Sequence, residues 1–300
     1  MKTMTVWVKR NIKLFFKDKA LFFTALITPA ILLVLYVTFL ENVYWDSFEM
    51  SIPAGMEISD KIIGAAVGGE LVSSLLAVCC VTVAFCANML MVQDKVTGAY
   101  QDMLISPVKR HIPAIGYYLA TLTVTLLISF VAVAGGLIYL GIMGWYLTVA
   151  DILLILLDVF LLTMFGTALS SVVNFFLSSQ GQISAVGTIV SSGYGFISGA
   201  YMPISQFPEG LQRVISFLPC TYGTSLLRNH TMRGSFEAMQ EAGIPTEVIE
   251  AIRDSVDCNL YFFDHKVEVG IMYLILGGSI VLLLGLYILL HLCLGKRKAQ

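Results

Sequence analysis

Residues 20–40 read ALFFTALITPAILLVLYVTFL and contain no charged side chain. At ~1.5 Å of rise per residue, a helix over this stretch is roughly 31 Å long, which matches the hydrocarbon core of a bilayer. The stretch is too long for the apolar core of a cleaved signal peptide, and no small-residue cleavage site follows it. It is therefore predicted to be a membrane-spanning helix.

Five further apolar stretches follow along the chain, at 62–92, 112–144, 152–177, 183–201 and 269–294. Of the 300 residues, 57% are hydrophobic and only 13% are charged, and the mean hydropathy is +0.83. A water-soluble domain of this size cannot hide so much apolar surface. We therefore expect a single all-α integral membrane domain over 1–300 with six spans.

Most of the lysine and arginine residues lie on one side of these predicted spans. Six precede the first span, three lie between the second and third, and three follow the last, which is twelve of the 18 in the chain. An even number of spans puts both ends of the chain on one side, and the positive-inside rule assigns that side to the cytoplasm. We expect a multi-pass protein of the cytoplasmic (inner or plasma) membrane with both termini in the cytoplasm.

Residues 1–19 are predicted to form an amphipathic helix before the first span. On a helical wheel its basic residues share one arc and its aromatic residues lie outside that arc. An interfacial elbow helix would bury these rings at the acyl boundary of membrane lipid and hold its cations near the headgroups. The alternative is a plain cytoplasmic extension of the first span. The residues concerned are Trp7, Lys9, Arg10, Lys13, Phe15, Phe16 and Lys17.

The loop at 93–111 contains the sequence DKVTGAYQDMLISP at 94–107. Gly98 interrupts the helix that arrives from the membrane and Pro107 stops the next one, so a short helix is expected between them. Tyr100, Met103 and Leu104 fall at i, i+3 and i+4, which makes one apolar stripe. The stripe either docks into a groove of another protein or packs on the cytoplasmic helix ends of this chain.

This loop resembles the coupling loop of the permease subunits of type-2 ABC exporters, a family of drug, antibiotic and polysaccharide exporters. Val96 and Gln101 stand where the family commonly has acidic residues. Residues 10–19 (RNIKLFFKDK) are similar to the family's amino-terminal elbow, and residues 198–219 (SGAYMPISQFPEGLQRVISFLP) are similar to its segment after the fifth span. The residues that match the coupling loop are Asp94, Lys95, Thr97, Gly98, Asp102, Met103, Leu104, Ser106 and Pro107.

The resemblance implies a permease subunit that moves an amphipathic or hydrophobic substrate out of the cell. The short helix at the coupling loop would dock into a separate ABC ATPase subunit, which would bind ATP and Mg. The chain itself has no GxxxxGK[ST] phosphate loop, so we expect it to bind no cofactor and to have no catalytic site. Two permease subunits, identical or related, would meet at the first, second and fifth spans around a central path.

Residues 202–268 are expected to form an outer hairpin and a small external cap. The stretch 211–227 would dip into the outer leaflet and return, as the resemblance implies, or would rest on the membrane as an amphipathic helix. A helix is predicted at 246–257 within the cap. Cys220 and Cys258 both lie in this outer segment and could form a disulfide where the compartment is oxidising.

Glu70 and Asp158 lie inside apolar spans, where an ionisable group needs a partner, a cavity or water. They are candidates for polar residues of the transport path, or else Glu70 lies near the outer interface and Asp158 makes an interhelical hydrogen bond. An ion- or proton-coupled carrier is the main alternative function and rests on these two residues. The absence of an internal repeat argues against a carrier built from two inverted halves.

Other function classes find little support in the sequence. An intramembrane hydrolase would need a motif such as HExxH or GxSxG, which the chain lacks, and its four histidines are predicted near or beyond the membrane edges. The net charge of −2 argues against a nucleic-acid partner. Six cysteines without a CxxC pair predict no metal site.

Overall fold

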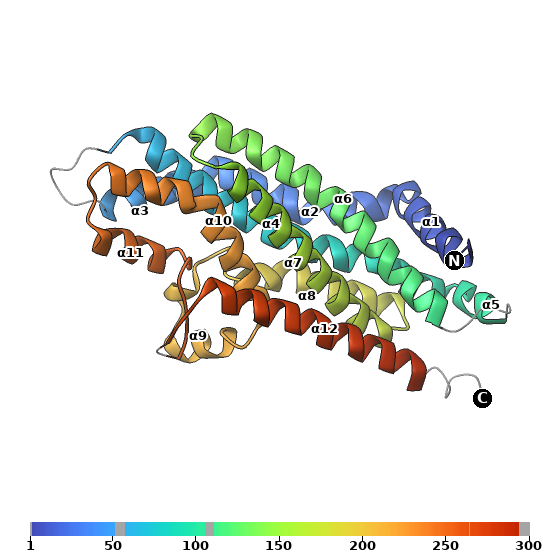
Figure 1. Ribbon diagram of the computed structural model, residues 1–300. Helices are drawn as coiled ribbons and strands as arrows, with labels where there is room; N and C mark the ends of the chain where they lie inside the picture. The colour runs from blue at the N-terminus through green and yellow to red at the C-terminus, as the bar shows by residue number, and fades with distance from the viewer. Residues whose placement is uncertain (1, 52–57, 106–110, 264, 294–300) are drawn as a thin grey trace.

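A computed structural model describes residues 2–51, 58–105, 111–263 and 265–293 of the protein. Its long helices lie side by side in one elongated bundle (Figure 1). The start of α1 (Lys2–Lys17), the short helix α5 (Ala99–Ile105) and the carboxyl end of α12 (Val269–Cys293) lie at one end, here the α5 end. The opposite end carries α3 (Glu41–Ser51) and α11 (Thr246–Ser255) and is here the α11 end.

Helix α4 (Asp60–Val96) is the centre of the bundle. Its sequence is apolar on all sides, which is typical of a helix surrounded by other helices, and it is buried along most of its length. Small residues allow its neighbours to approach closely. A Cβ at Gly69 would lie 2.7 Å from the Met232 side chain, and one at Gly166 would lie 3.0 Å from the Cys80 carbonyl oxygen. The neighbours are α2 (Lys19–Leu35), α6 (His111–Met143), α7 (Val149–Phe176), α8 (Gln180–Ile197) and α10 (Pro219–Glu241).

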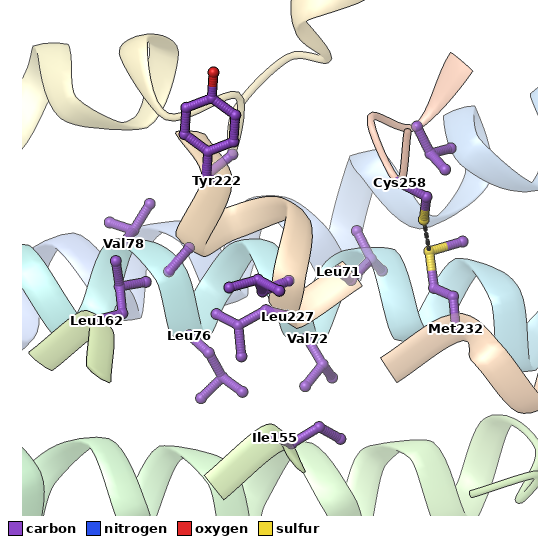
Figure 2. Close-up of a cluster of buried hydrophobic side chains, with 14 of the residues drawn as sticks. Leu71, Val72, Leu76, Val78, Ile155, Leu162, Tyr222, Leu227, Met232 and Cys258 are labelled. Carbon is purple, nitrogen blue, oxygen red and sulfur yellow. Dashed lines mark hydrogen bonds between the residues drawn. The ribbon is translucent and has the colours of Figure 1, made fainter. Parts of the chain in front are cut away.

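The largest apolar core forms where α4 meets α7 and α10. Val72 and Leu76 of α4 lie close to Leu227 of α10, with Ile155 of α7 beneath them (Figure 2). Leu76 and Leu227 have almost no exposed surface. The second and fourth predicted spans are therefore held together by α10, whose sequence is less apolar than that of a span.

The first apolar helix is longer than expected. Asp18 caps α2, since its carboxylate accepts a hydrogen bond of 3.1 Å from the Leu21 amide. Helical structure then continues through a π-helical turn (Tyr36–Leu40) and α3 to Ser51. The prediction of a loop directly after residue 40 is wrong, because the residues from Glu41 to Ser51 continue the helix. The residue at which the membrane-spanning part ends stays a prediction.

Within the described ranges, five helical stretches are long and apolar enough to cross a membrane. Helix α8, which covers most of the predicted fifth span, is only 18 residues long and carries many glutamine, serine and threonine side chains. The count of six spans therefore stays a prediction. The five stretches are Lys19–Met50, Asp60–Val96, Ile112–Met143, Val149–Phe176 and Val269–Leu292.

The segment after α8 turns sharply before it returns to the bundle. A 3-10 turn (Ile204–Gln206) leads into the short helix α9 (Glu209–Ile215). After a break at residues 216–218, α10 begins at Pro219. The alternative of a single amphipathic helix over 211–227 is therefore wrong, since Ser216 ends α9 and Pro219 occupies the first turn of α10. The outer hairpin that the resemblance implies stays a prediction. Most of α10 is buried among α4, α7 and α12. Its depth in the membrane stays a prediction.

The external cap combines a helix and a β-hairpin. Helix α11 confirms the predicted helix at 246–257 apart from its last two residues, and it buries Ile249 and Ile252. Strands β1 (Leu260–Phe262) and β2 (His265–Val267) pair antiparallel. The structure is mostly helical (85%), as expected for an all-α membrane protein. The sequence analysis missed the small hairpin, because three-residue strands are too short to show a periodic pattern.

Candidate functional site

A short helix, α5, is present at one end of the bundle at the position where a coupling helix is predicted. Thr97 caps the end of α4, and Gly98 has a φ of +82°, a left-handed conformation that glycine adopts without strain. The amides of Gln101 and Asp102 donate to the Gly98 carbonyl oxygen at 2.9 and 3.2 Å. A single glycine thus ends α4 and starts α5 in a new direction.

Asp94, in the last turn of α4 before α5, connects α4 to α1 and α6. Its carboxylate receives two hydrogen bonds from Arg10 of α1, at 2.7 and 3.1 Å, and one of 2.5 Å from the Tyr117 hydroxyl of α6. The hydrogen bond to Asp94 raises the pKa of the Arg10 guanidinium. A bidentate arginine–carboxylate pair fixes direction as well as distance, so the last turn of α4 is tied to both α1 and α6.

Lys95 makes the corresponding connection to α7. Its ammonium donates to the carbonyl oxygens of Asn174, Phe175 and Leu177 at 2.8–3.3 Å. These are carbonyls that the end of a helix leaves without an intrahelical partner, and a cation there also favours the helix dipole. Neighbouring residues Asp94 and Lys95 therefore couple the base of α5 to α1, α6 and α7.

At least one residue of the predicted docking stripe on α5 does not face outward. Tyr100 packs within this chain, with its ring centroid 6.4 Å from that of Tyr117, which agrees with the alternative that the stripe covers the chain's own helix ends. The exposed side chains of α5 are instead Gln101, Asp102 and Ile105. The side chains of Met103 and Leu104, and all of Ser106 and Pro107, lie outside the described residues.

Replacing Asp94 with asparagine is expected to loosen α1 from the bundle. The variant loses the charge that holds Arg10 and weakens the partner of the buried Tyr117 hydroxyl, at a cost of roughly 1–3 kcal/mol. Limited trypsin digestion of the purified protein should cut faster after Arg10 and Lys13. Asp102→Asn on exposed α5 is the control, and equal cleavage rates in the two variants would contradict this role of Asp94.

The predicted elbow is a helix, but its aromatic face is only partly free for lipid. Trp7 and Phe15 are buried within the protein, with Trp7 edge-on to Tyr117 at 5.9 Å. Their predicted place at the acyl boundary is wrong, because the helix packs against α6 rather than lying apart from the bundle. The side chains of the elbow that face outward are Lys9, Lys13, Phe16 and Lys17.

A groove of about 1060 Å³ runs between α2 and α8, both of which pack on α4. Its walls mix aliphatic side chains such as Ile31 and Ile183 with the hydroxyls of Thr24, Ser184 and Thr188. It extends from Asp18, Gln93 and Gln180 near the α5 end to Tyr44 and Pro203 near the α11 end. Polar groups on largely apolar walls are typical of sites that bind amphipathic molecules.

The groove and the coupling region share one helix. Gln93 of α4 lines the groove, and the next two residues, Asp94 and Lys95, hold the base of α5. The floor of the groove and the base of α5 are therefore joined through consecutive residues of α4.

A sequence model of the ABC-2 type transporters matches residues 3–231, which is most of the chain. The chain belongs to the ABC-2 type transporter family. It is therefore a multi-pass transmembrane component of an ABC-type transporter, a family that generally works with an ATPase subunit. A search of curated proteins found no match. The matched range ends within α10, so the cap and α12 lie beyond it.

Glu70 of this ABC-2 permease is completely buried beside Arg228 of α10. The Arg228 guanidinium lies 2.7 Å from Glu70, 3.1 Å from Asp257 of the cap, and donates a 2.6 Å hydrogen bond to the Gly199 carbonyl oxygen. Asp257 also accepts from the Ile204 amide at 2.6 Å. Three distant segments thus meet at one arginine. The sequence analysis missed Arg228, although an intramembrane glutamate requires a cation nearby.

Asp158 of the permease has a similar set of buried partners. His230 Nδ1 lies 2.5 Å from one Asp158 oxygen, and the Tyr273 hydroxyl donates to the other at 2.5 Å. This joins α7, α10 and α12. Helix α10 places the buried His230 inside the bundle beside Asp158, a contact that the sequence analysis missed. The position of His230 relative to the membrane edge stays a prediction. Neither Glu70 nor Asp158 lines the groove between α2 and α8. Their buried partners favour the alternative that the two acids hold helices together and are not part of the transport path.

The two outer cysteines of the permease are not bridged. Cys220 and Cys258 are both buried free thiols. The Cys258 sulfur points toward Met232 at 4.0 Å (Figure 2), and Met232 lies on α10 twelve residues beyond Cys220. The possible disulfide is therefore not formed in this structure, because Met232, which lies beside Cys258, is about 18 Å along α10 from Cys220.

Proposed function

We propose that this permease is the membrane-spanning half of an ATP-driven exporter for amphipathic or hydrophobic molecules. A separate ABC ATPase subunit would hydrolyse ATP with Mg, and a second permease subunit, identical or related, would complete the path. The protein would lie in the cytoplasmic membrane with the α5 end in the cytoplasm. The location of α5, the start of α1 and the end of α12 at that one end supports this orientation (Figure 1).

The groove between α2 and α8 is the observation that carries the proposal. It contains no basic residue and has Asp18 as its acidic residue at the α5 end, among the residues that line it. Such walls can hold the apolar part of a molecule, and the threonine and serine hydroxyls can bind its polar part. A second permease subunit set against this open side would convert the groove into a closed path.

The proposed power stroke enters through α5. When the ATPase subunits close on ATP, they would push α5, whose exposed side chains include Gln101, Asp102 and Ile105. The contacts of Asp94 and Lys95 would spread this displacement over α1, α4, α6 and α7 as one rigid unit. The groove would then alternate between states open to either side.

Purification of the full chain from its native host in mild detergent tests the proposal. We expect a stoichiometric ATPase subunit to co-purify and ATP hydrolysis by the complex to be inhibited by vanadate. A chain that purifies alone and without ATPase activity, in a preparation that retains transport, would overturn the exporter and favour a carrier. Asp158 and His230 would then be the residues that could bind a proton, because they form a buried acid–base pair.

Replacing Thr188 with tryptophan is expected to reduce transport by the complex about tenfold, since the ring would fill the groove from α8. The measurement is export from proteoliposomes of a fluorescent amphipathic dye that the wild-type complex transports. Ile189→Trp is the matched control, because Ile189 is the next residue on α8, is largely exposed and does not line the groove. Equal loss in both variants would contradict the proposed path.

A further inference from the structure

Three phenylalanine rings form an exposed cluster near the α11 end of the bundle. Phe217 follows α9, Phe262 ends β1 and Phe263 begins the turn of the β-hairpin. The centroid of Phe217 lies 5.1 Å from that of Phe262 and 6.2 Å from that of Phe263. Phe217 is nevertheless 61% exposed and Phe263 is 49% exposed. This cluster is built from two segments that are far apart in the sequence.

The backbone of the hairpin holds one of these rings at a conformational cost. Phe263 has a φ of +47°, which is an unfavourable conformation for a bulky residue. The Arg213 guanidinium of α9 lies over its ring at 6.0 Å. A glycine at position 263 would adopt this positive φ without strain. The phenylalanine ring at this position is therefore a specific feature of the hairpin.

The cluster borders a cleft of about 370 Å³ beside the start of α12. The size is near the lower end of the roughly 300–1,000 Å³ of ligand pockets. Lys266 of β2 lies at the cleft and donates to Glu250 at 2.9 Å, which leaves two of its three ammonium protons for another acceptor. The apolar residues that line the cleft are Phe217, Tyr222, Phe262, Val267, Ile271 and Ile275.

The cleft adjoins exposed apolar side chains of α12. Helix α12 is one of the helices apolar and long enough to span the membrane, and it starts two residues after β2. Ile271 is half exposed and Leu274 is 75% exposed, so apolar surface extends from the cleft along α12. A hairpin that directly precedes a membrane-spanning helix is expected at the membrane interface, where aromatic side chains are enriched and amphipathic elements bury their apolar faces.

We propose that this cleft binds one acyl chain of a phospholipid from the leaflet at the α11 end. The chain lies against Ile271 and Ile275, the phenylalanine cluster covers it, and the phosphate lies beside Lys266. The site is separate from the groove between α2 and α8. Its residues on the hairpin and α12 lie beyond the range matched by the transporter family, whereas Phe217 and Tyr222 lie within that range. A bound lipid would hold the cap against the end of α12.

Photo-crosslinking in nanodiscs tests the site with the full chain. The nanodiscs contain phosphatidylcholine with a small fraction of an analogue that carries a diazirine in one acyl chain, and labelled peptides are mapped by mass spectrometry. Ile275 lines the cleft and Leu274 does not, although the two residues lie at the same depth and Leu274 is the more exposed. We expect several-fold more labelling of Ile275 than of Leu274.

A variant that fills the cleft provides the second measurement. Ile271→Trp should reduce the labelling of Ile275 several-fold, whereas Val281→Trp, on the exposed side of α12 away from the cleft, should leave it unchanged. Greater labelling of Leu274 than of Ile275 in the wild-type protein would show annular lipid only and would overturn the proposal. That comparison needs no variant, so it holds even if Ile271→Trp fails to fold.

Discussion

Replacement of Arg228 with methionine is expected to lower the free energy of unfolding by roughly 3–5 kcal/mol, the usual cost of removing one partner from a buried ion pair. Arg228 is only 1% exposed and lies between the carboxylates of Glu70 and Asp257. The variant would leave both acids buried without their cation. It would also remove the hydrogen bond to the Gly199 carbonyl oxygen.

In Arg228→Met, the loss of stability should be seen first in the segment where the cap meets the bundle. Asp257 accepts from the amides of Ile204 and Ser205, so its displacement would release the segment that follows α8. Hydrogen exchange by mass spectrometry should show faster exchange at 199–206 in Arg228→Met than in the wild-type protein. Thermal unfolding in detergent gives the global effect.

Matched variants separate charge from packing. Arg213→Met removes an exposed arginine whose pair with Glu209 is long, at 3.9 Å, and should change stability little. The triple variant Arg228→Met, Glu70→Gln, Asp257→Asn should recover part of the stability, since no buried charge remains uncompensated. If Arg228→Met were as stable as Arg213→Met, the cluster would have no structural role.

Replacement of Gly98 with alanine is expected to uncouple ATP hydrolysis from export in the proposed complex. A residue with a Cβ disfavours the left-handed conformation by about 1–2 kcal/mol, which shifts the population of this turn roughly 5- to 30-fold. The direction of α5 relative to α4 would then be lost in most molecules. Export should fall by about the same factor, while the chain still folds and binds its ATPase subunit.

The surroundings of Gly98 make this a clean test of backbone conformation. Among the described residues, and apart from the two chain neighbours of Gly98, no atom lies within 4 Å of the position that a Cβ would take. The alanine therefore meets no steric obstacle from them. Gly181→Ala in α8 is the control, because its Cβ also meets no atom but its backbone is an ordinary helix. Dye export and vanadate-sensitive ATP hydrolysis are measured in proteoliposomes. Unchanged export per ATP in Gly98→Ala would contradict the role of α5 as the coupling element.

Side-chain periodicity and charge pattern correctly located the elements at the α5 end. Gly98 and Pro107 predicted a short helix after the second span, and α5 lies there because a glycine at a helix end favours a change of direction in any tertiary context. Helix α11 was likewise predicted from its own apolar stripe. These are local properties, which depend on residues within one or two turns.

The sequence by itself determined that this protein is a helical membrane protein with long apolar helices, because apolar length and composition are properties of contiguous residues. Only the tertiary structure decided the partners of its charged groups. Arg10 binds Asp94 rather than lipid, Glu70 meets Arg228 and Asp158 meets His230 across separations of 72 to 158 residues in the chain. Such pairs arise from the packing of distant helices, and no local pattern specifies which buried acid meets which base.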